Sequence, residues 1–418
     1  MEYQISEKIR RSLAQLLLQP FVQETLKSIK ASNEDSVEEQ IEFTKTEAPT
    51  FHEEGRSRLL CAKLKALGLD NAQTDDNKNV IASIKGSRLD ERVLLEAHMD
   101  TVYSFGTVKT VRREGNMIYA PGILDNARGI ANLLTVVRAL QKTDVKTIRP
   151  LLIAGTTREE AAGGLGGMRD LFQHYPDIRA SVSIDGGFFE KLTFNATFNK
   201  ACEYIFRGPG GHAFNAFGLA ANPIGAASRT VVKLQGLSVP ETPRTTYAAS
   251  KIISAEDSGI TAIPENCRLY INFRSDGAEE FKALEESIEA CIQAGVQEEN
   301  ERWHAAQITV EKKELLSLPG GRQSAHLPLV EAAMLCGTYV GAATELRYSG
   351  NSNSNIPISK GIPAVTVGGS RTNYHSHSAS NEYFCTEEAY RLPQGVFLLM
   401  LMLLGVEGVI EPLELGGE

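Results

Sequence analysis

The chain has 418 residues, of which 42% are hydrophobic and 23% are charged, close to the averages of soluble globular proteins. This length predicts two or three domains, or one large domain that carries an insertion. The formal net charge of -9 argues against nucleic acid and anionic membrane surfaces as partners, because like charges repel.

Secretion and membrane insertion are not predicted. Charged residues are scattered through the first 20 positions, which lack the apolar stretch of a secretory signal. The most apolar run, residues 395–406, is too short to span a bilayer and suits a buried helix. The six cysteines are widely spaced without a CxxC pair, which predicts free buried thiols in a reducing compartment. The expected location is therefore cytoplasmic.

The first part of the chain alternates helical and strand patterns. Residues 1–30, 36–49 and 53–68 place apolar side chains at helical spacing. Strands that alternate with helices predict an α/β sheet with parallel pairing. Four apolar runs supply the expected strands: residues 79–86, 92–100, 149–157 and 180–187.

A second pattern begins near residue 200. Three strand-like segments and two helical segments supply the first five elements of a β-α-β-β-α-β order, which is typical of a compact ferredoxin-like α+β unit. The strand-like segments are 201–214, 244–257 and 266–276, and the helical segments are 222–236 and 278–295.

The α/β pattern returns near the end, with a helical segment at 327–341 and an apolar run at 361–369. We therefore predict an α/β fold in which a discontinuous catalytic domain, with a mixed and largely parallel sheet, is interrupted by a smaller α+β domain. The predicted boundaries are 1–198 and 315–418 for the two parts of the catalytic domain, and 199–314 for the insertion.

The segment VLLEAHMDTV, residues 93–102, ends an apolar run with a histidine and a carboxylate. Alternate residues of a strand share a face, so His98 and Asp100 are expected to project together from the strand's end. Whatever chemistry they perform, they can perform it jointly.

Further acidic residues follow the other apolar runs. Asp125 lies in APGILDNARG, Glu159 and Glu160 follow the third run, and Asp185 follows the fourth. Ligands of open α/β sheets bind beyond the carboxyl ends of the strands, so these groups are expected to converge there. Crowded carboxylates must take up protons or bind a cation. Imidazole and carboxylates without thiolate suit zinc, and also manganese or cobalt.

Taken singly, these motifs have plainer explanations. Asp125 fits a helix N-cap before the helical segment that follows it. Glu159 and Glu160 fit a solvated charged turn. Their joint order favours the metal site, which then needs another histidine from elsewhere in the chain. His375 and His377 are the two candidates.

The ordered motifs HMDTV, APGILDNARG, TTREEAAGG, IDGG, GPGGHA and HSASNE cover nearly the whole chain, and together they resemble the M20 family of co-catalytic metallopeptidases and amidohydrolases. The resemblance implies two Zn²⁺ ions per subunit, with Mn²⁺ or Co²⁺ as alternatives. It also implies that the inserted domain is a lid and dimerisation domain. The implied ligands are Asp125 between the metals, His98 and Asp185 on one metal, and Glu160 with His377, or alternatively His375, on the other.

The same resemblance implies roles around the metals. Glu159 would act as the general base on the water between the metals. Asp100 would orient His98 and fix its tautomer. His212 in GPGGHA resembles a histidine that reaches the site from the inserted domain, often from the partner subunit, and stabilises the oxyanion. A homodimer is therefore implied.

Substrate contacts are also implied by resemblance. Arg274 in NFRSDG stands where related peptidases hold a substrate carboxylate, a task that suits the bidentate guanidinium. Asn353 and Asn355 lie in a segment that resembles a substrate-side loop. Relatives usually carry aspartate near Asn353, and Thr261 stands where many carry asparagine, so substrate identity does not transfer from any one relative.

Three functions compete on these grounds. The favoured one is a metal-dependent exopeptidase that acts on small peptides, as a dipeptidase, tripeptidase or carboxypeptidase. The second is an amidohydrolase of the same fold that deacylates N-acyl amino acids. The third is an inactive binding relative, which predicts the loss of a ligand or of the base, whereas all of them are present. The expected partners are a small peptide or N-acyl amino acid and a second copy of the chain.

Overall fold

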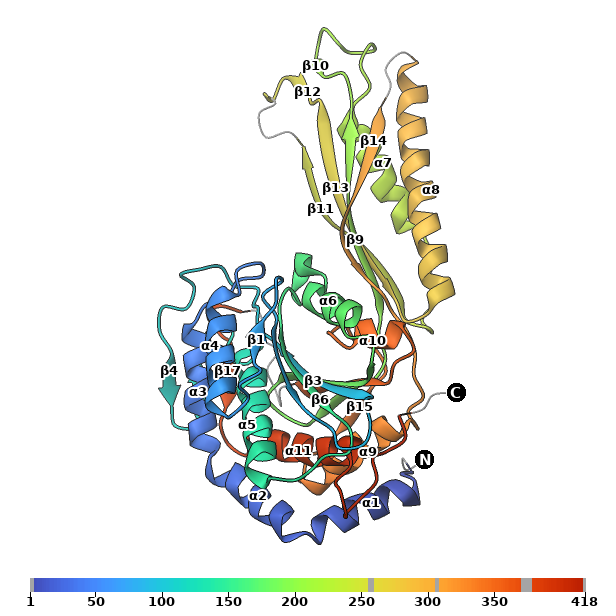
Figure 1. The fold of residues 1–418 in the computed structure, drawn as a ribbon. Coiled ribbons are helices and arrows are strands. Elements are labelled where there is room, and N and C mark those ends of the chain that lie inside the picture. Colours follow the sequence, from blue (N-terminus) through green and yellow to red (C-terminus); the bar gives the residue numbers. More distant parts are fainter. Residues whose placement is uncertain (1–3, 255–258, 305–307, 370–377, 416–418) are drawn as a thin grey trace. The chain divides into compact units, whose positions relative to one another are not determined.

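The chain divides into two compact units, one inserted into the other in sequence. The first unit comprises Met1–Ala196 with Arg322–Glu418, and the second comprises Thr197–Gly321 (Figure 1). Each unit has a sheet and a hydrophobic core of its own. The structure is a computed structural model that describes residues 4–254, 259–304, 308–369 and 378–415.

A mixed eight-stranded sheet forms the centre of the first unit. Its strands are β1 (Gln73–Thr74), β2 (Val80–Ile84), β3 (Arg92–His98), β6 (Leu151–Thr156), β7 (Ile178–Gly186), β8 (Lys191–Thr193), β15 (Glu345–Arg347) and β16 (Ala364–Gly369). Their order is β1-β2-β6-β3-β7-β16-β8-β15. The four central strands β6, β3, β7 and β16 are parallel neighbours, as the alternation of strands and helices predicts. A separate small sheet contains β4 (Arg112–Glu114), β5 (Met117–Tyr119) and β17 (Tyr383–Cys385).

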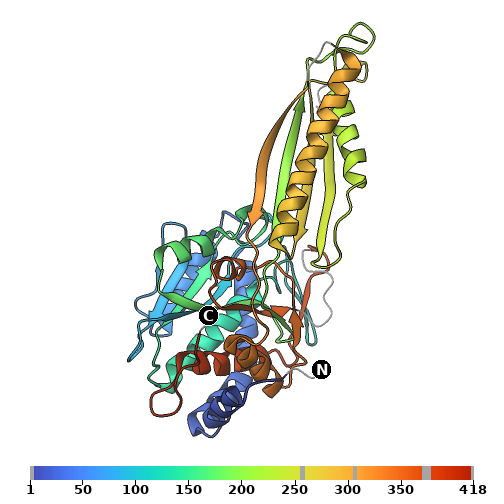
Figure 2. The same cartoon turned by 90° about the vertical axis from the view of Figure 1, so that its right-hand side faces the viewer.

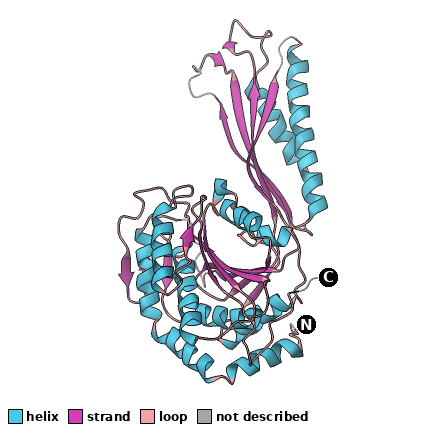
Figure 3. Cartoon of the chain, in the orientation of Figure 1, coloured by secondary structure: helices cyan, strands magenta, loops and turns pink. Residues whose placement is uncertain are grey.

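Helices enclose the sheet of the first unit (Figure 3). The last of them is apolar on all sides, as expected for a helix that is buried on all sides. The helices are α1 (Glu7–Leu17), α2 (Pro20–Ala31), α3 (Asn33–Lys45), α4 (Glu54–Ala66), α5 (Ala127–Thr143), α6 (Gly166–His174), α9 (Pro328–Tyr339), α10 (Asn355–Ser359) and α11 (Arg391–Leu404), with a short 3-10 turn at Ala161–Gly163.

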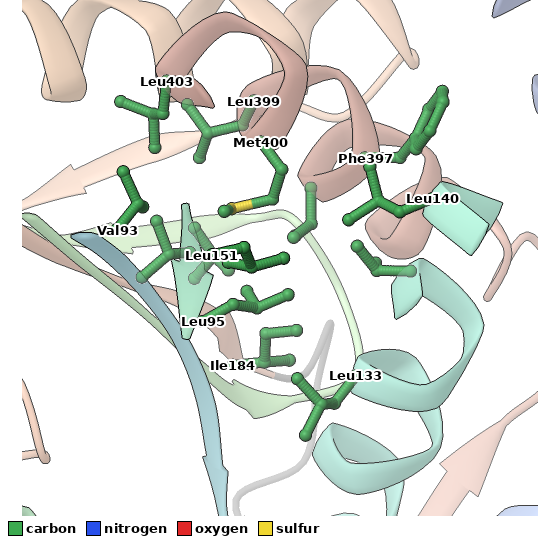
Figure 4. Close-up of a cluster of buried hydrophobic side chains, with 14 of the residues drawn as sticks. Val93, Leu95, Leu133, Leu140, Leu151, Ile184, Phe397, Leu399, Met400 and Leu403 are labelled. Carbon is green, nitrogen blue, oxygen red and sulfur yellow. The ribbon is translucent and has the colours of Figure 1, made fainter. Parts of the chain in front are cut away.

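The main core lies between one face of this sheet and helices α5 and α11. Val93 and Leu95 of β3 point into it, and Leu133 of α5 and Met400 of α11 meet them (Figure 4). All four side chains are fully buried. Because alternate residues of a strand point to opposite faces, Leu94 and Glu96 lie on the face opposite to Val93 and Leu95.

The opposite face of β3 carries a buried polar network. Glu96 accepts hydrogen bonds from the hydroxyl of Thr156 (3.0 Å) and from the side-chain amide of Asn353 (2.9 Å). Asn353 also donates to the Thr156 hydroxyl at 2.8 Å. His98 follows Glu96 on this face, so the end of β3 presents an imidazole next to this hydrogen-bonded network.

The second unit is a four-stranded antiparallel sheet with two helices on one side (Figures 1 and 2). Its main elements are β9 (Phe198–Arg207), α7 (Pro223–Gln235), β11 (Thr245–Ser254), β13 (Asn266–Ser275), α8 (Ala278–Trp303) and β14 (Thr309–Leu318), and a two-stranded ribbon pairs β10 (Gly211–His212) with β12 (Ala262–Ile263). The strand order is β11-β13-β9-β14, which confirms the predicted ferredoxin-like arrangement.

All six cysteines lie in described residues and are free thiols. Four are buried, but Cys61 and Cys385 are only half-buried, so the expectation that all would be buried was too broad. Among the helices of the described ranges, none has the length and apolar character that crossing a bilayer requires.

Candidate metal centre

The predicted site residues of the first unit gather where parallel strands end. His98 is the last residue of β3, Glu159 and Glu160 follow the neighbouring strand β6, and Asp185 lies near the end of β7. Because β6, β3 and β7 are adjacent and parallel, their carboxyl ends meet at one edge of the sheet.

The imidazole of His98 lies among carboxylates and is only 3% exposed. Its Nδ1 is 3.5 Å from Oδ1 of Asp100. Its Nε2 is 3.1 Å from Oδ1 of Asp125 and 3.9 Å from Oδ1 of Asp185. One ring nitrogen therefore faces Asp100, and the other faces the two carboxylates predicted as metal ligands.

Three of the predicted ligands already share one small volume. The ligand atoms of His98, Asp125 and Glu160 all lie within 4.8 Å of one another. A buried imidazole nitrogen and carboxylate oxygens, with no thiolate among them, form a donor set that suits zinc and related divalent cations. The residues present therefore fit the implied metal.

Asp100 holds neighbouring segments of the site through hydrogen bonds. It is fully buried and accepts the backbone amides of Glu159 and Glu160, each at 2.9 Å, and the hydroxyl of Thr50 at 2.9 Å. The sequence predicted only its contact with His98. The structure adds that the same carboxylate fixes the backbone of both glutamates.

The electrostatics reflect this crowding of like charges. Burial raises the pKa of Glu159 well above its ordinary value, and the nearby carboxylates Glu160 and Asp185 raise it further. Burial alone would lower the pKa of His98, but Glu159 and the surrounding carboxylates raise it well above its ordinary value. The cluster therefore demands positive charge, which a proton or a metal ion can supply.

The loop that carries Asp125 is held by a residue from the end of the chain. The buried carboxylate of Glu382 accepts the backbone amides of Gly122 (2.9 Å), Leu124 (2.9 Å) and Asp125 (3.2 Å), and the Tyr103 hydroxyl at 2.7 Å. Burial raises the pKa of Glu382, and these hydrogen bonds offset only part of that effect. Glu382 lies in the HSASNE motif, but no feature of the sequence assigned it a role.

Asn126 ties the same loop to the end of β7. Its side-chain amide donates to the carbonyl of Ile184 at 2.9 Å and accepts the amide of Gly186 at 3.1 Å. A Cβ at Gly129 would lie 1.9 Å from Oδ1 of Asn126, so glycine is required there. Two independent anchors thus fix the backbone around Asp125.

Arg56 is a second residue that the sequence gave no reason to select. Its fully buried guanidinium donates to the carbonyls of Phe43 (3.0 Å), Thr46 (2.9 Å) and Met99 (2.8 Å). Burial lowers the pKa of Arg56 to about 10, while the charge of Asp100 acts in the opposite direction. Arg56 therefore remains charged at neutral pH and places a permanent cation behind the acidic cluster.

The predicted substrate residues Asn353 and Asn355 are both buried. The side-chain nitrogen of Asn353 donates to Glu96 and Thr156, and Oδ1 of Asn355 accepts the backbone amide of Ser352 at 3.0 Å. These hydrogen bonds are internal to the first unit. The candidate metal ligands His375 and His377 lie outside the described residues.

His212 and Arg274 belong to the second unit. His212 is exposed on the β10–β12 ribbon, and its Nδ1 accepts the amide of Phe214 at 3.3 Å. Arg274 is exposed near the end of β13, where its Nε donates to Oδ1 of Asn272 at 3.2 Å. Both side chains are therefore available to solvent within this unit.

Two family models match the chain. The model of peptidase family M28 matches residues 79–233, the stretch that contains every predicted metal-site residue except the C-terminal histidine. The model of the M20 peptidase dimerisation domain matches residues 198–300, which lie in the second unit.

Individual proteins of known type are also similar. Carboxypeptidase G2 of a Pseudomonas species is 27% identical over 245 residues, which cover 56% of this chain and only 58% of the carboxypeptidase. A tripeptidase structure from Staphylococcus aureus superimposes with a TM-score of 0.72 at 19% identity, covering 88% of this chain and 97% of that chain. Bacillus subtilis YxeP, a dinuclear metal-binding peptidase from the M20 family, gives a TM-score of 0.64 at 14% identity, covering 90% and 99%.

The fold, the donor cluster and these matches define a hydrolase of the metallopeptidase class. The match to the M20 peptidase dimerisation domain and the ordered ligand motifs make the chain similar to the M20-type metallopeptidases.

Proposed function

We propose that this chain is a metal-dependent exopeptidase that hydrolyses a peptide bond of small peptides. The observation that carries the proposal is the cluster of His98, Asp125 and Glu160, beside which Asp100 fixes the backbone of Glu159. A metal-ligand set next to an independently positioned carboxylate is what hydrolysis of an amide by activated water requires.

Zn²⁺ is the proposed cofactor, with two ions per subunit and with Mn²⁺ or Co²⁺ as alternatives. When bound, the metal lowers the pKa of a coordinated water toward neutrality and polarises the substrate carbonyl. The residues that would hold it are His98, Asp125, Glu160, Asp185 and His377.

The chain's own residues carry the proton. Glu159 takes a proton from the attacking water and delivers it to the nitrogen of the leaving amine. Asp100 keeps Glu159 in place through the backbone amide, and it holds Nδ1 of His98 so that Nε2 faces the ligands. Water activation and protonation of the leaving group thus both depend on the carboxylate of Glu159 and on Asp100, which holds the Glu159 backbone in place.

Several finer assignments stay predictions. His212 is proposed as a donor to the developing oxyanion, and Arg274 as the partner of a substrate carboxylate. Asn353 and Asn355 are proposed to shape the substrate side of the site indirectly, because their side-chain amides form hydrogen bonds with Glu96 and Ser352 inside the first unit. A homodimer is supported by the matched dimerisation domain, and light scattering on the purified protein tests it. The cytoplasmic location is likewise a prediction.

The test is hydrolysis of a mixed panel by metal-stripped protein, with zinc, manganese or cobalt added back. The panel contains dipeptides, tripeptides and N-acetyl amino acids. We expect metal-restored cleavage of peptides with a free amino terminus. Cleavage confined to the N-acetyl compounds would contradict the exopeptidase and assign an amidohydrolase, and no cleavage with any metal would favour an inactive binding relative.

A further inference from the structure

Two loops run side by side at the metal centre. Residues 48–52 precede α4, and residues 101–105 follow β3 and Asp100. The amide of Thr101 donates to the carbonyl of Ala48 at 3.0 Å, and the amide of Thr50 donates back to the carbonyl of Thr101 at 3.3 Å. These hydrogen bonds place the first loop against the strand end that supplies His98 and Asp100.

The first loop is joined to the catalytic glutamates through Asp100. A single oxygen, Oδ2 of Asp100, accepts both the hydroxyl of Thr50 and the backbone amide of Glu160, each at 2.9 Å. Thr50 and Glu160 are therefore separated by only one carboxylate oxygen.

A second carboxylate connects the same two segments, at the residue after Thr50 and at the residue before Glu159. Oε1 of the buried Glu53 accepts the backbone amides of both Phe51 and Arg158, each at 3.0 Å. Arg158 directly precedes the proposed base Glu159. Phe51 has a φ of 75°, a backbone conformation that a bulky residue adopts only when its surroundings impose it. The structure thus holds Phe51 in a strained conformation, on the same carboxylate oxygen that holds the residue before the proposed base.

Three of the side chains that these loops present to solvent are large and apolar. Phe51 is 54% exposed, Phe105 is 61% exposed and Val102 is 40% exposed. The ring of His52 contacts the ring of Phe105, with 5.7 Å between their centroids. We call the exposed residues Phe51, His52, Val102 and Phe105 of these two adjoining loops the aromatic rim.

The exposure of Phe105 is maintained by a fixed backbone. The carboxylate of Glu47 accepts the amides of Gly106 and Val108, each at 2.9 Å, and so holds the loop immediately after Phe105. An exposed apolar group kept in place by hydrogen bonds is typical of a binding surface rather than of chance exposure.

We propose that the aromatic rim binds a large apolar side chain of the substrate, such as leucine or phenylalanine, in a residue that flanks the scissile bond. The occupant is a substrate side chain because the rim is continuous with the catalytic segment through Asp100 and Glu53. This inference rests on the proposed peptidase function and adds its side-chain preference.

The experiment compares tripeptides of glycine in which leucine or asparagine replaces each position in turn. Leucine and asparagine are close in size, so the ratio of their kcat/KM values reports apolar binding. We expect the zinc-loaded protein to favour leucine about 10-fold or more at one position, as an apolar pocket allows. Phe105→Ser and Phe51→Ser should each lower this ratio several-fold, while Phe105→Leu should largely keep it.

Leu18→Ser is the matched control, because Leu18 is an apolar residue that is 80% exposed at the end of α1. It should change neither the ratio nor the activity. The proposed role of the aromatic rim is refuted if the protein cleaves peptides without preferring leucine. It is also refuted if both serine variants keep the leucine-to-asparagine ratio of kcat/KM. The peptidase proposal survives either result. If no peptide is cleaved with any metal, the proposed function and the rim fail together.

Discussion

The carboxylate of Asp100 accepts the backbone amide of Glu159 at 2.9 Å, while its neighbour two residues earlier in β3, His98, faces it through Nδ1. The proposed metal ligand and the proposed base are therefore positioned by one buried group. A change at Asp100 should disturb the chemistry without removing any group that reacts.

Asp100→Asn tests this relationship. The asparagine amide would direct an NH₂ group at one of the backbone amides that now donate to the carboxylate, so the segment of Glu159 and Glu160 must shift. We expect kcat to fall about 10- to 100-fold with a smaller change in KM, since groups behind metal sites contribute on this scale. Steady-state kinetics and metal analysis measure both effects, with the exposed Asp70→Asn as control. Unchanged kcat would contradict the positioning role.

Glu159→Gln should remove the base and leave the ligands. The amide cannot take a proton, so turnover should fall about 100-fold or more, which is the usual contribution of a general base. Bound zinc, measured by atomic spectroscopy, should remain close to that of the unmodified protein. The exposed Glu24→Gln should behave like the unmodified protein. Turnover that persists in Glu159→Gln would show that another group activates the water.

Metal content alone tests the ligands. His98→Ala should lower bound zinc sharply because the imidazole nitrogen faces the carboxylate cluster. His377→Ala should lower it as well, and His375→Ala should not. The exposed His174 provides a control substitution to alanine. Loss of zinc in His375→Ala instead of His377→Ala would transfer the C-terminal ligand to His375.

Glu382→Gln should weaken the whole first unit. Its carboxylate accepts hydrogen bonds from four donors, and an NH₂ group in its place would face at least one of them. A buried group left unsatisfied costs about 1 to 3 kcal/mol, which should appear as a lower midpoint of urea unfolding. Glu387→Gln, an exposed change nearby, is the control. Equal midpoints for the two variants would show that Glu382 does not stabilise the loop.

Acid should weaken the second unit through Glu285. Burial acts to raise the pKa of Glu285, but hydrogen bonds from Lys200 and Lys312, both 2.9 Å, outweigh burial and leave that pKa lowered. A lowered folded pKa means that this stabilisation is present above the unfolded pKa and is lost as pH falls through the folded value. Glu285→Gln should flatten the loss of thermal stability between pH 5 and pH 3. The exposed neighbour Glu286→Gln should not, and equal slopes would contradict the assignment.

The sequence predicted the central strands well, because β3, β6 and β7 are nearly continuous apolar runs. It could not show β8 and β15, which have only three residues each and extend the sheet at one edge. Such short strands are defined by their neighbours in space, so no periodicity within them reveals their pairing.

The candidate site likewise contains residues that the sequence predicted and residues that it did not. The gathering of candidate ligands at the ends of the strands could be inferred from composition and order, since parallel strands bring their carboxyl ends together. Glu53, Arg56 and Glu382 could not be inferred, because each acts on the main chain of a distant segment. Backbone amides and carbonyls are the same at every residue, so such contacts leave no pattern of residue types.

The anchoring of the Asp125 loop by Glu382 has a consequence for synthesis of the protein. The two residues are 257 positions apart, so the anchor leaves the ribosome long after the loop that it holds. The second unit, with its own core, is translated completely in the interval. We therefore expect a nascent chain to form the inserted unit first and to acquire its metal only once translation is almost finished.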